Sequence, residues 1–282
     1  MSDLAVLQAR AQMPSPSEWG SSGLVRLLGS GWALAAAVAA ALLGAAIAEA
    51  ATATGRPGVL SILVKWAPLI FTGFLFNLLV SVASMAIGTA AGVLLGLAQI
   101  SLLAPVRKAA WLLTQFFRNA PWLVLLFFAT FLLPFEIRVG DAAIPFPAWL
   151  KAIFGLSLPV LANVSEIVRG GVLSIPVGQW ESAESLAFSR TQTIWRIILP
   201  QATKRMIPPW MNLYAILTMA TTLISVVGIQ DSMTLTRGAL VAEGRVDLYL
   251  PIYFMLLCMF FAYCYPIARY TQVLERRFAE RH

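Results

Sequence analysis

Side chains that commonly carry out catalysis are scarce in this sequence. The only histidine is His282, and the only two cysteines, Cys258 and Cys264, lie six residues apart in one apolar run. On a helix this spacing turns the two thiols in different directions, and it matches no CxxC or zinc pattern. The composition therefore argues against Ser-His or Cys-His catalysis and against a histidine metal site. We interpret the cysteines as small apolar packing residues.

Four polar side chains lie in or near apolar runs, where polar groups are costly and often functional. They are Asn77, Asn163, Glu166 and Asn212. We expect them to contact a substrate along a pathway through the membrane. For Glu166 a second interpretation stays open, because Arg169 follows three residues later and the two side chains can pair on one helix face.

The segment Gln179–Ala202 is a polar, helix-prone island in an otherwise apolar chain, and it is too charged to cross a membrane. Ser174 and Pro176 suit the beginning of a helix, as a cap and in the first turn respectively. Glu181 then lies early in that helix, where a negative charge complements the helix dipole. The island therefore predicts a helix that starts soon after Ser174.

A bend is predicted inside the same island. Ala183 and Ala187 are four residues apart, and on a continuous helix they would share a face that another protein could approach closely. Ser189 and Gln192 have the spacing of a capping box, which marks the start of a second short helix. Pro200 is expected to limit that helix. The pattern predicts a helix-turn-helix elbow projecting from the membrane.

The overall composition is that of an integral membrane protein. The 282 residues are 59% hydrophobic and 12% charged, whereas soluble domains carry roughly 25% charged residues. The apolar runs are long and continuous, which favours helices over a barrel. A first span is expected within residues 24–50. Its end, Ala48-Glu49-Ala50, resembles a signal-peptide cleavage site, but the length of the run favours a retained helix.

Five further spans follow from the remaining apolar runs, at about residues 70–103, 111–134, 149–173, 207–228 and 250–270. The predicted organisation is thus an N-terminal tail at 1–23, an additional helix at 24–50, a core at 66–270 and a basic tail at 271–282. The loop at 174–202 lies between two spans. Gly88, Gly92 and Gly96 repeat at four-residue spacing, which predicts a face for close helix packing.

The net charge of +7 first suggests a nucleic-acid partner. Most of the charges flank apolar runs, however, as expected for residues that orient a membrane protein. The predicted topology places fourteen of the 20 lysines and arginines on the cytoplasmic side. We therefore expect both termini and the polar island to be cytoplasmic, and no nucleic-acid partner.

The polar island also resembles a known sequence motif. Glu181-Ser182-Ala183 is followed after three residues by Ala187 and after nine more by Ile197-Ile198-Leu199-Pro200. This spacing resembles the cytoplasmic coupling loop of ABC-importer permeases, EAA-x3-G-x9-I-x-LP. The chain departs from it in having Ser182 for the first alanine and Ala187 for the glycine, and the second change puts a glycine-dependent bend in doubt.

Flanking segments narrow the resemblance to permeases of polar amino acid importers, such as those for histidine, glutamine or arginine. Arg118-Asn119-Ala120-Pro121 looks like their R-[GN]-T-P segment. The stretch Ser165–Gln179 resembles their E-I-x-R-G-G-I-x-S-x-P-x-G-Q approach to the loop. The stretch Thr222–Asp231 resembles their T-S-L-x-S-V-I-G-x-Q-D segment. Together the similarity covers about residues 66–270.

The resemblance implies an all-α membrane protein with the type I ABC importer transmembrane fold, a five-helix core plus one additional N-terminal transmembrane helix. It implies a non-catalytic permease subunit in the bacterial inner membrane that forms half of a pathway for polar amino acids. Contacts with the ATPase are then carried by the loop, at Glu181, Ser182, Ala183, Leu186, Ala187, Ile197, Leu199 and Pro200.

The partners implied are two copies of an ATPase subunit, a second permease subunit that is a homologue or a copy of this chain, and a periplasmic solute-binding protein. No G-x-x-x-x-G-K-[ST] phosphate loop occurs in the chain. We expect this chain to bind no cofactor, with ATP and Mg²⁺ held by the ATPase.

Two other classes of protein make different demands on the sequence. A proton-coupled secondary transporter would use Glu166 as its coupling carboxylate. Three features argue against this class: the apolar runs contain few charges, the sequence has no internal repeat, and a secondary transporter has no need of the elbow. An intramembrane enzyme would need a histidine or a pair of carboxylates inside the spans, and the sequence offers neither.

Overall fold

The computed structural model describes residues 57–139 and 142–279. The predicted tail at 1–23 and the predicted helix at 24–50 lie outside the described residues. The chain divides into two units, residues 1–65 and 66–282, and nearly all described residues belong to the second. The first half contains α4 (Val59–Gln99, which begins in the first unit), α5 (Ala104–Asn119), α6 (Trp122–Leu132), the strands β1 (Glu136–Val139) and β2 (Ala142–Pro145), and α7 (Ala148–Leu173). The polar island follows as α8 (Val177–Ser185), α9 (Arg190–Thr193) and the π-helix η1 (Ile194–Ile198). The last elements are α10 (Leu199–Ala220), the 3-10 helix η2 (Thr221–Val227), α11 (Ser232–Glu243), the 3-10 helix η3 (Val246–Leu248) and α12 (Tyr249–Ala279).

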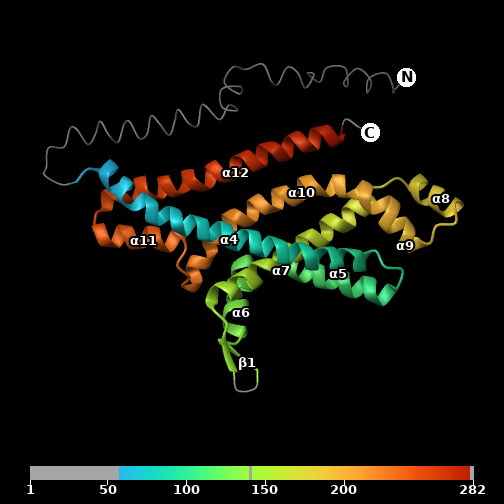
Figure 1. Cartoon of the computed structure of the whole chain (residues 1–282), viewed down its shortest axis with the longest axis horizontal. Coiled ribbons are helices and arrows are strands. Elements are labelled where there is room, and N and C mark those ends of the chain that lie inside the picture. Colours follow the sequence, from blue (N-terminus) through green and yellow to red (C-terminus); the bar gives the residue numbers. More distant parts are fainter. Residues whose placement is uncertain (1–56, 140–141, 280–282) are drawn as a thin grey trace, which may run out of the picture. The chain divides into compact units, whose positions relative to one another are not determined.

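The described part of the chain is predominantly helical, as predicted. Four helical stretches are long and apolar enough to cross a membrane: Val59–Gln99, Ala148–Leu173, Arg190–Val227 and Val246–Arg276. α10 packs against α7 and α12, and α7 packs against α5 and α6 (Figure 1). The last helix, α12, continues through the start of the predicted basic tail to Ala279.

The stretch predicted as one span at 111–134 is instead two helices. α5 and α6 meet at an angle of 103° around Ala120 and Pro121, both of which have extended backbone conformations. Proline disfavours the helical conformation for the residue before it and cannot donate to the preceding turn. Pro121 is the cap residue of α6 rather than part of its first turn. The stretch predicted as one span at 111–134 is therefore sharply bent, and the pair is either one broken span or a re-entrant loop.

The predicted external loop contains a short β-hairpin. β1 pairs with β2 in antiparallel register, with Ile137 opposite Ile144. Next to it Lys151 is almost fully buried, and its ammonium group donates to the carbonyl oxygens of Thr130 at 3.2 Å and Leu133 at 3.0 Å. Cations favour the carbonyl end of a helix. Lys151 therefore ties α7 to the end of α6 just before the hairpin begins.

The core lies where α4, α6, α7, α10 and η2 meet. Its fully buried side chains include Val80, Leu126, Leu156, Leu217 and Ile224. These residues come from runs that are apolar on all sides, so the sequence alone does not say which face turns inward. The packing of α7 against its neighbours holds the polar groups of this helix in fixed positions.

The predicted glycine face packs as expected. A Cβ atom on Gly92 would lie 2.7 Å from the carbonyl oxygen of Leu161 and 2.7 Å from the Cβ of Val164, both on α7. Added Cβ atoms on Gly88 and Gly96 would collide with Val160 and Val168 in the same way. The absence of side chains at these positions is what lets α4 lie directly against α7.

Replacing Gly92 with leucine should destabilise the protein by about 1–3 kcal/mol, because overpacking a close contact forces helices apart. The measurement is the thermal midpoint in detergent, which should fall by several degrees. Gly238→Leu is the matched control, since no atom lies within 4 Å of a Cβ added there. Equal midpoints for the two variants would contradict the packing role of Gly92.

Candidate functional site

A cavity of about 560 Å³ lies where the end of α5 meets α7 and α10. Its polar and charged lining residues are Arg118, Asn163, Glu166, Arg169, Ser174, Arg205 and Asn212. Three of the four residues predicted to contact substrate, Asn163, Glu166 and Asn212, are thus brought to one place. They come from two helices that are far apart in the sequence, so only tertiary packing assembles them.

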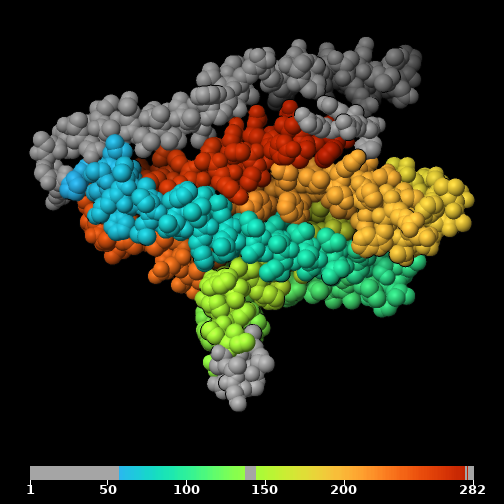
Figure 2. Space-filling view, in the orientation of Figure 1, coloured from blue at the N-terminus to red at the C-terminus, as the bar shows by residue number. Residues whose placement is uncertain are grey.

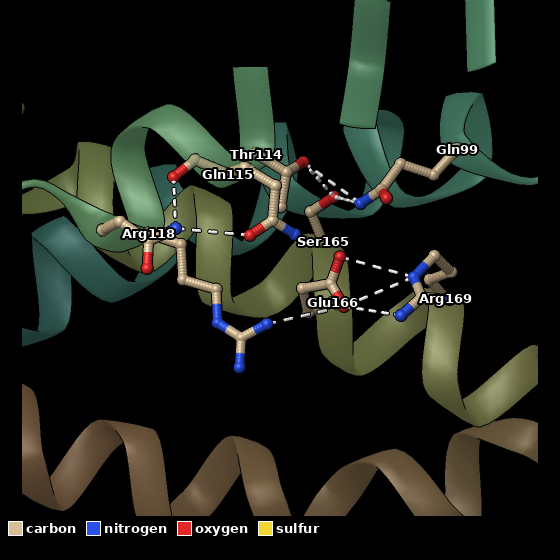
Figure 3. Close-up of polar contacts among 8 residues, drawn as sticks. Gln99, Thr114, Gln115, Arg118, Ser165, Glu166 and Arg169 are labelled. Carbon is tan, nitrogen blue, oxygen red and sulfur yellow. Dashed lines mark hydrogen bonds and ion pairs between the residues drawn. The ribbon is translucent and has the colours of Figure 1, made fainter. Parts of the chain in front are cut away.

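Glu166 pairs with two arginines at the edge of this cavity (Figure 3). Nη2 of Arg169 lies 2.8 Å from its Oε2, and Nη1 of Arg118 lies 3.7 Å from the same oxygen. The predicted pairing with Arg169 is confirmed, and Glu166 also lines the cavity. The guanidinium of Arg205 donates to the carbonyl oxygen of Ser174. With three arginines and a single carboxylate, the cavity favours a negatively charged guest group.

A buried hydrogen-bond network lies behind this charged group. Nε2 of Gln99 donates to Oγ of Ser165 at 2.7 Å and to Oγ1 of Thr114 at 3.1 Å, and the two hydroxyl groups are 3.1 Å apart (Figure 3). The network joins α4, α5 and α7 beside Glu166. Sequence reasoning missed Gln99 and Thr114. The available signal was that both are polar residues within or beside otherwise apolar runs.

Asn77, the fourth predicted substrate residue, lies outside this cavity. It is fully buried, and its Nδ2 donates to Oγ1 of Thr221 at 3.1 Å and to Oδ2 of Asp231 at 3.2 Å. Its Oδ1 accepts from the backbone N–H of Ser232 at 3.0 Å. With these bonds its amide group is occupied inside the protein. Asn77 holds α4 to η2 and to the start of α11, apart from the other three residues predicted to contact substrate.

The polar island forms the predicted elbow at one end of the second unit (Figure 2). α8 runs from Val177 to Ser185, and a new helix begins at Arg190. The capping box predicted for Ser189 and Gln192 is confirmed by bonds in both directions, of 2.9 Å and 3.3 Å. The island therefore bends where its local sequence predicts a second helix.

The bend is a Schellman motif with alanine at its centre. The N–H of Ala187 donates to the carbonyl of Glu184 at 2.9 Å, and that of Phe188 donates to the carbonyl of Ala183 at 3.1 Å. These are the two bonds of the motif. Ala187 has φ of +59°, which makes it the only residue other than glycine with positive φ in the described part of the chain. The doubt about a glycine-dependent bend is resolved, because alanine adopts the conformation that glycine favours.

Two details of the predicted elbow are wrong. Ala183 and Ala187 do not share a helix face, since α8 ends at Ser185 and Ala187 lies in the turn beyond it. Pro200 does not limit the second helix, because η1 runs directly into α10 and the helix continues to Val227. Pro200 lies in the first turn of α10, where the preceding π-helix has already changed the hydrogen-bond pattern and a missing N–H is tolerated.

The eight residues expected to contact the ATPase divide into two groups. Five are exposed: Glu181, Ser182, Leu186, Ala187 and Pro200. The other three turn inward: Ala183 is 1% exposed, and Ile197 and Leu199 pack on a small cluster formed by Val172, Ile175, Ile198 and Ala202. The exposed group is available to a partner protein, whereas the inward group fixes the shape of the elbow.

Replacing Ala187 with glycine should stabilise the elbow by about 1 kcal/mol, because a left-handed conformation costs a residue with a Cβ roughly that much. Slower amide hydrogen exchange across Val177–Ser189 would report the effect. Ala187→Val should act in the opposite direction, since β-branched residues tolerate positive φ worst. Faster exchange in the glycine variant would contradict this account of the bend.

The sequence matches a family of membrane transport proteins. Residues 88–280 match the model of the binding-protein-dependent transport system inner membrane component. This range includes the elbow and every residue that lines the cavity. The chain belongs to this family. It is therefore a permease subunit of an ABC importer, a class that works with an ATPase and a substrate-binding protein.

Individual relatives agree with this assignment of the permease. This chain is 34% identical over 212 residues to the probable amino-acid ABC transporter permease protein YckA of Bacillus subtilis (strain 168). The alignment covers 75% of this chain and 90% of YckA. The chain is 31% identical to the inner membrane amino-acid ABC transporter permease protein YhdY of Escherichia coli (strain K12), covering 73% of this chain. In that comparison the permease spans about half of the relative, 55% of its length.

Solved structures share the fold of the permease. The crystal structure of an amino acid ABC transporter with histidines has a TM-score of 0.68 and 25% identity, and the match covers 79% of this chain and 99% of that one. An inward-facing MetNI methionine ABC transporter has a TM-score of 0.54 at 16% identity, with 78% and 97% covered, which supports the fold alone. The predicted type I importer fold of the core is thereby confirmed.

Proposed function

We propose that this permease carries polar amino acids into the cell and that the cavity between α5, α7 and α10 is part of its pathway. The observation that carries the proposal is the set of charges in the cavity, Arg118, Arg169 and Arg205 with one carboxylate, Glu166. A free amino acid has a carboxylate that guanidinium groups bind well and an ammonium group that a carboxylate binds. The amides of Asn163 and Asn212 can recognise a polar side chain, and about 560 Å³ is ample for one amino acid.

The elbow is the proposed contact with the ATPase. Glu181, Ser182 and Leu186 lie exposed along α8 and its end. Arg190 anchors the elbow to the carbonyl oxygen of Ile100, and Arg205 ties α10 to the end of α7 through the carbonyl oxygen of Ser174. A rigid lever of this kind transmits movement from a partner into α7 and α10. Binding of ATP by two ATPase subunits would then shift the permease between inward-facing and outward-facing states, as differential binding requires. ATP and Mg²⁺ stay with the ATPase.

The proposed assembly contains two permease subunits, either two copies of this chain or this chain and a homologue. The proposed orientation has the elbow and both termini in the cytoplasm, and the distribution of basic residues supports it. A solute-binding protein would deliver the amino acid on the opposite side, near the β1–β2 hairpin and the segment from Gln230 to Asp247.

The alternative of a proton-coupled transporter using Glu166 finds no support among these relatives, which include ABC permeases of B. subtilis and E. coli. The two mechanisms differ in their energy source. Uptake that persists after the proton gradient is dissipated and stops when ATP is depleted is the expected result. Replacing Glu166 with glutamine would then alter substrate preference rather than proton dependence.

The deciding experiment is purification of the intact complex through this chain in mild detergent. We expect an ATPase subunit in the complex and a free amino acid as the bound ligand by mass spectrometry. Addition of that amino acid with its binding protein should stimulate ATP hydrolysis in proteoliposomes. Recovery of the chain without an ATPase under conditions that preserve its fold would contradict the proposal, as would a ligand of another chemical class.

A further inference from the structure

A second cavity, of about 440 Å³, lies between the end of α4 and the elbow. Arg169 is the one lining residue that it has in common with the cavity between α5, α7 and α10. Its cationic lining residues are Arg107 on α5, Arg169 on α7 and Arg190 on α9. Among the described residues that line it there is no aspartate or glutamate. The charge of this cavity is therefore positive.

Two of the arginines converge on the short turn after α4. Nη1 of Arg107 donates to the carbonyl oxygen of Ser101 at 3.0 Å, and Nη2 of Arg190 donates to that of Ile100 at 3.3 Å. Each bond uses one donor of a guanidinium group that has five. Both side chains are thus held beside the same turn with further N–H groups for a ligand. The guanidinium of Arg190 also lies 5.6 Å from the ring centre of Trp180, which fixes its orientation.

The third arginine is partly neutralised, and the other two are not. Arg169 binds Glu166 at 2.8 Å. Within the described part of the chain, Arg107 and Arg190 contact backbone carbonyl oxygens and an aromatic ring, and neither forms an ion pair with a carboxylate. An anion with several acceptor oxygens is the complement of two converging guanidinium groups.

Part of the cavity wall is apolar. Ile100, Leu102, Val172 and Leu173 line it, alongside Trp180 and the polar residues Gln99 and Ser101. Leu102 is 69% exposed and Leu173 is 64% exposed, so this wall opens outward rather than into the core. A cavity lined by both arginines and exposed leucines fits a molecule that has an anionic group and an apolar part. Basic pockets between membrane helices are known to hold anionic lipid headgroups.

We propose that this cavity binds the phosphate group of an anionic phospholipid, with an acyl chain lying over Leu102 and Leu173. Arg107 and Arg190 supply the donors to the phosphate oxygens. The bound lipid would join α5 to α9 and Trp180 of α8, and so hold the elbow in place relative to α4 and α7. The site does not depend on which substrate the permease carries or on how the elbow meets the ATPase.

The test is lipid binding by the full chain in detergent, followed by the thermal midpoint and by native mass spectrometry. Adding phosphatidylglycerol should raise the midpoint in a saturable way, and phosphatidylcholine should not. In Arg107→Gln/Arg190→Gln the apparent affinity for phosphatidylglycerol should fall about 25-fold, because each basic group near an anionic lipid contributes about a factor of five. The control with the same loss of charge is Arg196→Gln/Lys204→Gln, whose exposed side chains do not line the cavity.

Three outcomes would overturn the proposal. One is an equal loss of affinity in the control variant, which would mean that net charge alone attracts the lipid. Another is inorganic phosphate in the millimolar range giving the same shift as the lipid, which would make the ligand a free anion. The third is unchanged lipid binding in the double glutamine variant. Arg107→Lys/Arg190→Lys, which keeps both charges, should retain more affinity than the glutamine pair and separates lost binding from lost folding.

Discussion

Replacing Glu181 with lysine should separate the permease from its ATPase and abolish uptake. Glu181 is exposed on α8, and within the described residues its side chain forms no ion pair or hydrogen bond. Reversing its charge therefore has little to disturb inside the chain. At a protein interface, breaking a buried charge pair costs about 2–5 kcal/mol, which corresponds to at least thirtyfold weaker binding. The measurements are ATPase recovery on purification through this chain and substrate uptake in the same cells.

The matched control is Glu275→Lys, which makes the same change of charge at an exposed position on α12, outside the elbow. It should leave both ATPase recovery and uptake close to the original values. Normal uptake by the Glu181 variant would refute the assignment of this residue to the ATPase contact. A lowered thermal midpoint in that variant would also count against it, because the loss would then come from folding.

Replacing Gly170 with leucine should block transport without loss of stability. Gly170 lines the cavity between α5, α7 and α10, and no atom lies within 4 Å of a Cβ added there. A leucine side chain would therefore occupy space in the proposed pathway beside Glu166 and Arg169. We expect uptake to fall by more than about tenfold, as expected when more than about 1.4 kcal/mol of binding is lost. Thermal stability should stay equal or rise by up to about 1 kcal/mol, because leucine favours a helix more than glycine does.

The adjacent glycine provides a sharp contrast. A Cβ atom on Gly171 would lie 2.6 Å from Cε and from Cγ of Met206 on α10, so Gly171→Leu should lower the thermal midpoint. Gly238→Leu adds the same side chain in open space on α11 and should change neither property substantially. If Gly170→Leu transports at the original rate while remaining folded, the cavity is not the pathway.

Local features of the sequence predicted much of this molecule. The apolar runs predicted the long helices because burial of the backbone in a membrane requires them. The capping box of Ser189 and Gln192 and the glycine face of α4 were also predictable, since both depend on residues three or four positions apart. The pairing of Glu166 with Arg169 belongs to the same class of short-range interaction.

The two prolines show where local reasoning failed. Pro121 lies between α5 and α6, which meet at an angle of 103°. Pro200 lies in the first turn of α10, and the helix continues past this proline. The residue type is the same, and the outcome depends on the turn before each proline. Ala120 is extended, while Ile194–Ile198 form a π-helix that accommodates the missing N–H. A single sequence contains no direct signal for that difference.

The sequence by itself determined the class of the protein, its construction from long apolar helices and the elbow, because composition and short-range periodicity carry that information. Only the tertiary structure decided that Asn163, Glu166 and Asn212 share a cavity with three arginines while Asn77 is enclosed between α4 and α11. All four are polar residues in or near apolar runs, so they look alike in the chain. Which of them faces a cavity depends on how helices distant in the sequence pack together, and that is set by side-chain contacts across the whole core.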